Sequence, residues 1–246
     1  AALAASVSAQ TQAQLERIQA SYLLAFGKKA TEAEVGYWSK QSAQSISDLI
    51  ANHQRYLKQD VGTHRATIKR SYIDALGREP NDGEYKHWLS GSDTYTQLMK
   101  NHVAWLRGNP AEYEKVIRRS YRLVLNSTPS AAEINYWKGQ GTLSYAMLAA
   151  AHDWWKKQNP SGNGKPAAKA TIAPASTTYL TVAPVSAAVA AEAIKAAGLI
   201  GNDGGSLVGN DGASLVAAGG GHLVAAGGGN LVAAGGGNLV AAGAGN

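Results

Sequence analysis

The sequence predicts two regions of different fold class: an α-helical N-terminal domain of three tandem three-helix repeats, and a C-terminal repetitive β-stem. Three observations support this prediction. Residues 199–246 are six copies of one octapeptide, residues 1–158 repeat a helical pattern about every 50 residues, and a Pro/Ala/Ser/Thr-rich segment separates the two regions. A short fixed period indicates a unit that buries its apolar residues only by stacking on copies of itself.

Every octad begins with Leu followed by Ile or Val, and 16 of the chain's 28 glycines lie in this tract. The leucines are Leu199, Leu207, Leu215, Leu223, Leu231 and Leu239. A period of eight is not a multiple of three, which excludes collagen-type and polyproline-type helices, and it does not match the α-helical period. Because eight is even, a strand keeps each leucine on the same face. We therefore expect a short strand and a glycine-rich corner in each octad.

Two assemblies satisfy this geometry. In a β-solenoid, two or three octads of one chain form each coil, whereas in a trimeric β-prism three chains each contribute one octad per layer. We favour the prism because a parallel homotrimer leaves no free sheet edge, so the leucines are predicted to hold three copies together. A flexible glycine-rich linker is the alternative, and the strict apolar register argues against it.

Composition excludes several classes of function. The chain has no cysteine, so disulfides and cysteine zinc sites are excluded, and no apolar run is long enough to span a membrane. Asp203 and Asp211 are weak calcium candidates, because the later octads carry Gly at this position; no metal or cofactor is expected. The formal charge of +6 falls within residues 1–158. It is too diffuse for a nucleic-acid site and suits a polysaccharide or another virion or surface protein.

The helical repeats align on a Ser-Tyr pair, with a Trp 16 residues after the Tyr and a closing Leu-x-x-x-His-x-x-aromatic stretch. The predicted units cover about residues 11–60, 61–110 and 111–158. Their predicted core residues are Tyr22, Trp38 and His53 in the first unit, Tyr72, Trp88 and His102 in the second, and Tyr121, Trp137 and His152 in the third. An apolar stripe at helical spacing predicts the first helix of each unit.

Helix-terminating and helix-initiating residues recur at the same place in each unit. Gly27, Gly77 and Asn126 follow the first stripe, where a left-handed cap is expected. A capping box then predicts the start of a second helix. The boxes are Thr31-x-x-Glu34, Asn81-x-x-Glu84 and Ser130-x-x-Glu133. The recurring glutamates are therefore explained without catalysis.

The run Ser-Tyr-x-x-x-Leu-Gly-Arg-x-Pro-x-x-x-Glu-x-x-x-Trp, from Ser71 to Trp88, resembles a bacterial helical repeat family of unknown function. That family is similar to phycobilisome linker domains and occurs in secreted surface proteins, S-layer-type proteins, adhesins and some phage structural proteins. The first copy departs by having Ala30 in place of Pro, and the third has Asn126-Ser127 in place of Gly-Arg. The resemblance implies a helical scaffold or binding role and supplies no catalytic residues. The octads likewise resemble stem repeats of phage tail fibres and surface adhesins.

No residue is assigned to catalysis. The three recurring histidines lie about 50 residues apart, so they are expected in the cores of separate units rather than at one metal. Several aromatic residues fall outside the aligned positions, and these are expected either in the core or in contact with a partner or a glycan. They are Tyr95, Tyr113, Tyr145 and Trp154.

Residues 159–186 are expected to form an extended linker, and residues 187–198 a short Ala-rich helix. Val189 and Ile194 give this helix apolar positions with which it could bundle three chains. Together these features predict a non-enzymatic attachment fibre, extracellular or part of a virion, with a helical docking or binding head. The alternative is a secreted bacterial surface adhesin or S-layer-type protein that binds polysaccharide.

Overall fold

The computed structural model describes the backbone of residues 2–159 and 187–196, and of five strands between residues 207 and 242. Side chains are described for most of residues 11–156 and for five positions of the last helix. Within these parts the first 159 residues are helical and contain no strand. None of the described helices is both long and apolar enough to cross a membrane.

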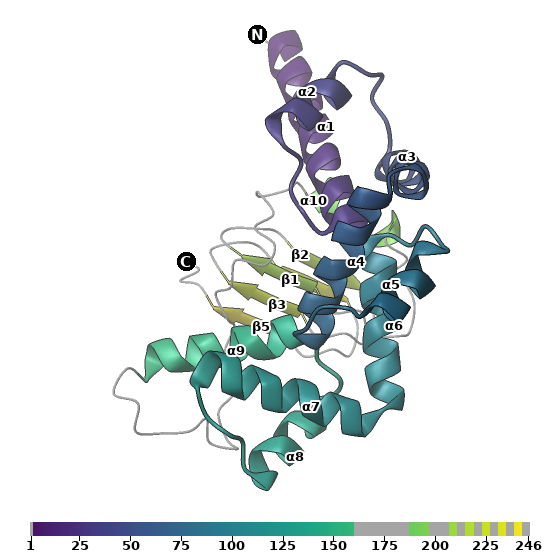
Figure 1. Cartoon of the computed structure of the whole chain (residues 1–246). Helices are drawn as coiled ribbons and strands as arrows, with labels where there is room; N and C mark the ends of the chain where they lie inside the picture. Colours follow the sequence, from purple (N-terminus) through teal and green to yellow (C-terminus); the bar gives the residue numbers. More distant parts are fainter. Residues whose placement is uncertain are drawn as a thin grey trace.

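Each of the three units contributes three helices in the order long, short, long (Figure 1). The first unit consists of α1 (Ala2–Phe26), α2 (Glu32–Ser39) and α3 (Ile46–Gln59). The second consists of α4 (Val61–Leu76), α5 (Asp82–Leu89) and α6 (Tyr95–Gly108). The third consists of α7 (Pro110–Ser120) with a π-helical turn η1 (Tyr121–Leu125), α8 (Ala131–Gly139) and α9 (Tyr145–Gln158). The predicted α-helical domain of three-helix units is therefore confirmed.

The predicted helix boundaries are also confirmed. The left-handed caps have φ angles of 64° at Gly27, 68° at Gly77 and 49° at Asn126. All three capping boxes form, with each Glu side chain accepting a hydrogen bond from the backbone of the N-cap residue. The third helix of every unit begins with a further hydroxyl cap that the sequence analysis did not assign. These caps are Ser45, Thr94 and Ser144.

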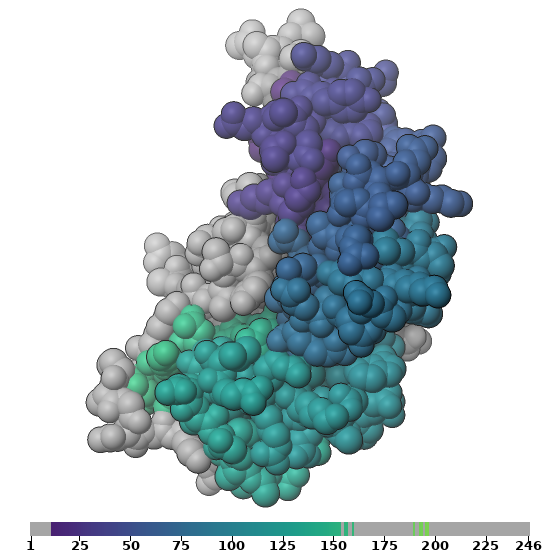
Figure 2. Space-filling view, viewed as in Figure 1, coloured from purple at the N-terminus to yellow at the C-terminus, as the bar shows by residue number. Residues whose placement is uncertain are grey.

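The units pack in series, and Figure 2 shows them following one another from purple to teal. At each junction the third helix of one unit packs against the first helix of the unit before it, α6 on α1 and α9 on α4. The second and third units share one hydrophobic core, whereas the first unit has a separate one. The head is thus a short array rather than three independent domains.

The five strands each cover the first four residues of an octad: β1 (Leu207–Asn210), β2 (Leu215–Ala218), β3 (Leu223–Ala226), β4 (Leu231–Ala234) and β5 (Leu239–Ala242). All pairs are parallel, and the strands pair alternately in the orders β1-β3-β5 and β2-β4. Leu207 pairs with Leu223, and Leu223 with Leu239. Paired strands are therefore two octads apart in the chain. The octad of Leu199 lies outside the described residues.

The Ala-rich helix α10 (Ala187–Ala196) lies against α1 and α3 of the first unit (Figure 1). Val189 is fully buried there, in one cluster with Ala20 and Ile46. The sequence predicts that this apolar position contributes to a bundle of three chains. In the structure the chain's own first unit covers it.

Candidate functional site

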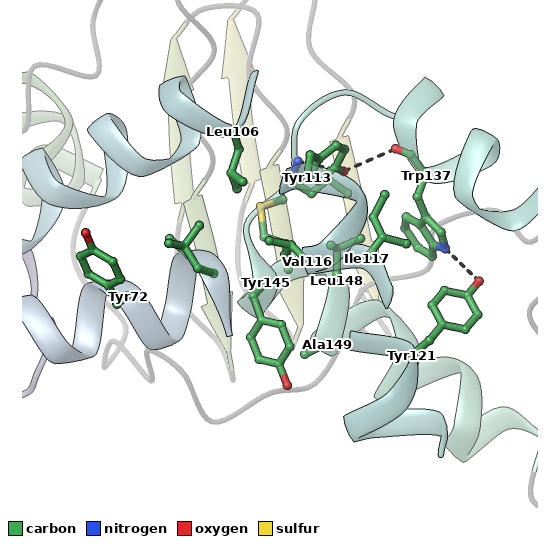
Figure 3. Packing of buried hydrophobic residues seen from close by; sticks show 14 of the residues in the cluster. Tyr72, Leu106, Tyr113, Val116, Ile117, Tyr121, Trp137, Tyr145, Leu148 and Ala149 are labelled. Carbon is green, nitrogen blue, oxygen red and sulfur yellow. Dashed lines mark hydrogen bonds between the residues drawn. The ribbon is translucent and has the colours of Figure 1, made fainter. Parts of the chain in front are cut away.

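The recurring Ser, Tyr, Trp and His side chains meet in the centre of each unit. In the first unit the Trp38 Nε1–H donates to the Tyr22 hydroxyl at 3.1 Å, and the His53 ring lies edge-on to Tyr22 and Trp38 at centroid distances of 4.5 and 5.4 Å. The corresponding Trp-to-Tyr hydrogen bonds are 2.9 Å in the second unit and 3.0 Å in the third. Figure 3 shows the third, between Trp137 and Tyr121. We call this set the aromatic–histidine cluster of each unit.

Two of the clusters contain a Ser–His contact, which sequence reasoning missed. Ser21 Oγ lies 3.0 Å from His53 Nε2, and Ser71 Oγ lies 3.1 Å from His102 Nε2. This is the distance of a nucleophile and its base. However, each serine hydroxyl also lies 2.8 Å from a backbone carbonyl of its own helix, to which it donates its single proton. The histidine Nε2 is therefore the donor in the Ser–His contact, which is the opposite of what catalysis needs.

Burial determines the protonation state of these histidines. Loss of solvent lowers the pKa of His53 and of His102 to about 4. A nearby glutamate raises each pKa by a smaller amount, and a nearby cation lowers it. For His152, desolvation alone lowers the pKa to about 3, and neither ring nitrogen has a hydrogen-bond partner. All three rings are neutral at pH 7. Because both serines are fully buried, the clusters are suited to holding three helices together and not to meeting a substrate.

A cation–carboxylate pair closes the outer side of the cluster in two units. Lys28 Nζ lies 2.8 Å from Glu34 and 5.5 Å from the centroid of the Tyr22 ring. Arg78 makes two hydrogen bonds to Glu84, at 2.8 and 2.6 Å, and lies 5.3 Å from the centroid of the Tyr72 ring. The paired carboxylates thus serve the capping box and the cation together.

The third unit lacks this cation because Ser127 stands at the position of Lys28 and Arg78. Glu133 still closes its capping box through Oε2, but its buried Oε1 has no hydrogen-bond partner. The loss follows from the Asn126-Ser127 departure seen in the sequence. The missing cation leaves one buried carboxylate oxygen unpaired, which lowers the stability of the third unit.

The proposed contact residues do not lie on the surface. Tyr95, Tyr113 and Tyr145 are all buried, so of the two alternatives left open by the sequence these three take the core position and not the contact position. Tyr113 accepts from the Leu143 backbone N–H and donates to the carbonyl of Gly141. Tyr95 and Tyr145 occupy equivalent positions, each at the start of a third helix, and both pack into unit junctions. The side chain of Trp154 lies outside the described residues.

Other aromatic residues are exposed instead. The exposed fractions are 59 % for Tyr37, 48 % for Tyr56 and 45 % for Trp105. Tyr37 and Tyr56 both lie near the Tyr22 hydroxyl, whose pKa is raised by burial and to a smaller extent by Glu34 and these two tyrosines. Tyr56 and Trp105 each lie three residues after a core histidine, in the closing stretch of their units. Sequence alone gave no sign of their exposure.

The remaining predicted sites are the metal candidates and the leucines of the octads. No set of three or more His, Asp or Glu side chains suited to a metal ion occurs among the residues that the structure describes. Asp203 and Asp211, the calcium candidates, lie outside those residues. Leu207, Leu215, Leu223, Leu231 and Leu239 each begin one of the five strands.

No known protein family, curated protein or solved structure matched the chain in our comparisons. The class of protein therefore rests on the fold and the clusters. Three copies of one helical unit, each centred on the same buried Tyr–Trp–His set, define a tandem helical repeat protein.

Proposed function

We propose that this protein is a non-enzymatic structural attachment fibre, most simply a phage tail or virion fibre, with the helical array as its docking or binding head. The observation that carries the proposal is repetition on two scales, about fifty residues in the head and eight in the octads. In the first and second units of the head, the recurring polar side chains bond to one another or to their own backbone. Such a chain supplies shape and spacing rather than a reactive pocket.

The octads supply the stem in this proposal. Strands two octads apart pair in register, Leu on Leu and Val on Val. This register supports a coil of two octads within one chain, which is one of the arrangements that the sequence left open. Each coil adds about 4.8 Å along the axis, so repeating the octad lengthens the stem without changing its surface.

Replacing Leu223 with Asp is expected to remove the β-sheet circular dichroism signal and to leave the helical signal intact. Leu223 begins the central strand of the three-stranded sheet and pairs in register with Leu207 and Leu239, so the substitution puts a charge at a position where every paired strand carries Leu. Asn230→Asp adds the same charge outside the five strands and should preserve the signal.

Light scattering with and without calcium then decides the assembly. A single-chain mass that does not depend on calcium supports the two-octad coil, and a threefold mass supports the trimeric prism. Sheet formation only in the presence of calcium would contradict the virion fibre and favour the adhesin. If L223D leaves the spectrum unchanged, the octads do not form a stem.

The exposed aromatic residues favour a second function for the head, binding of an acidic polysaccharide by a secreted surface adhesin. Tyr37 and Tyr56 present exposed, partly polar rings, and both affect the pKa of Tyr22, over whose ring Lys28 lies. The head carries the whole excess of positive charge. Stacked rings and cations are a suitable combination for charged sugars.

Migration through gels that contain alginate, an acidic polysaccharide, tests this function. We expect the chain to be retarded, and Y37A/Y56A to lose most of the retardation, whereas Val61→Ala, another exposed residue, should have no effect. If salt abolishes the retardation and Y37A/Y56A does not change it, the interaction depends on net charge alone and not on the aromatic rings. Dextran provides the neutral control.

A further inference from the structure

The two unit junctions share one geometry. The third helix of a unit begins against the end of the first helix of the preceding unit. Tyr95 covers Gly27 and Tyr145 covers Gly77, so closely that a Cβ atom at these glycines would lie 2.6 and 2.4 Å from the tyrosine rings. Each junction thus brings the start of a third helix onto a helix from outside the unit.

In the first unit the same position is filled by Ile46, the first residue of α3, and the helix that covers it is α10. Ile46 and Val189 are both fully buried. Helix α10 therefore takes the place that the first helix of a preceding unit holds at the other two junctions. It packs on a surface formed by Arg17, Ala20, Leu24, Ile46 and Ile50, which we call the docking surface.

The sequence of the docking surface is adapted to this helix. The position equivalent to Ala20 carries arginine in the other units: Arg70 lies against Gly27, and Arg119 donates to the Leu76 carbonyl. These arginines extend across their junctions toward the preceding unit. Alanine at position 20 leaves room for Val189 to pack directly on the surface.

Polar contacts fix the orientation of α10. One oxygen of Glu192 accepts the backbone N–H of Ile46 at 2.7 Å, and the other pairs with Arg17 Nε at 2.8 Å. The Ile46 N–H lies in the first turn of α3, where backbone donors have no partner within the helix and a negative charge is favourable. A single carboxylate on α10 thus recognises a helix N-terminus and an arginine together.

We propose that the docking surface also receives α10 from a second copy of this chain, so that exchanged helices link neighbouring heads. Twenty-eight residues, 159–186, join α9 to α10 in the sequence. A tether of this length gives a helix an effective concentration only on the order of millimolar at its own surface. The contacts are the same within one chain and between two, so crowding of chains shifts the balance toward exchange. The proposal does not depend on whether the octads form a stem.

Two variants separate docking within a chain from docking between chains. Val189→Asp disables α10 and leaves the docking surface intact, whereas Ala20→Arg blocks the surface and leaves α10 intact. Arginine is the residue that the other units carry at this position, so A20R should keep the helical fold. Lys195→Asp adds an acidic residue to an exposed position of α10 and serves as the matched control.

Light scattering of full-length chains gives the readout. Each variant alone should retain the mass of the unmodified chain at low concentration. A 1:1 mixture of V189D and A20R, in the millimolar range, should yield complexes of twice that mass, because the α10 of one chain fits the surface of the other. The double variant A20R/V189D has no functional α10, so its mixture with V189D should form no complexes. Complexes in that mixture would overturn the proposal. So would their absence from the mixture of V189D and A20R when both variants are folded.

Discussion

Replacing Gly77 with alanine is expected to lower the free energy of unfolding of the helical array by about 2–4 kcal/mol. Two independent costs add at this residue. Its φ angle is +68°, which costs a residue with a side chain about 1–2 kcal/mol. The new methyl group would also lie 2.4 Å from Cδ2 of Tyr145, so the junction between the second and third units must open.

Urea unfolding followed by circular dichroism measures this effect, and Gly36→Ala provides the control. A Cβ atom at Gly36, within α2, would meet no atom within 4 Å. Alanine is the better helix former there, so G36A should stabilise the protein by about 0.5–1 kcal/mol. Equal effects of G77A and G36A would mean that the junction does not form as described.

The same glycine shows how far the sequence predicts this fold. Its position after an apolar stripe was enough to assign the left-handed cap, since capping is a local property of the chain. Its contact with Tyr145 was not predictable, because the two residues are 68 apart in the sequence, as are Gly27 and Tyr95. Sequence alignment found the units, but it could not show which surfaces face each other.

The role of Tyr95 and Tyr145 was left open between core and contact for a related reason. Tyr95 and Tyr145 seemed independent of the repeat because the first unit carries Ile46 at the equivalent position. The structure shows one junction position with two kinds of residue, tyrosine against a preceding unit and isoleucine against α10. The difference in residue type between the repeats thus reflects a different neighbouring helix, and it does not identify an exposed binding residue.

Acidification from pH 7 to pH 4 is expected to destabilise the helical array strongly. Burial lowers the pKa of His64, and the same holds for the three histidines of the clusters. Their pKa values in the folded protein are about 4, 4 and 3, below an unfolded value near 6.5. The unfolded chain therefore binds more protons in this range, and stability falls as the pH drops. For His53 and His102 a difference of about 2.5 pKa units corresponds to about 3 kcal/mol each once the pH reaches the folded value, and the difference for His152 is larger.

Other titrating groups act in distinguishable ways. Burial raises the pKa of Asp74. Protonation of this carboxylate on acidification therefore stabilises the folded protein and partly offsets the effect of the histidines. The pKa values of Glu34 and Glu84 are lowered by their hydrogen bonds to Lys28 and Arg78, and their contributions are lost only below about pH 4.5. The interval between pH 6.5 and 5 thus reports mainly on the histidines.

Unfolding free energies measured across that interval test the assignment. His102→Asn removes one buried titrating ring. The slope of the unfolding free energy against pH should therefore fall by the contribution of that ring, even though the variant is less stable at pH 7. His87→Asn replaces a histidine at an exposed position outside the clusters and serves as the matched control. If the two variants keep the same slope, the clusters do not govern acid stability. If only H102N flattens it, the neutral rings that join the three helices of each unit also set the pH below which the head comes apart.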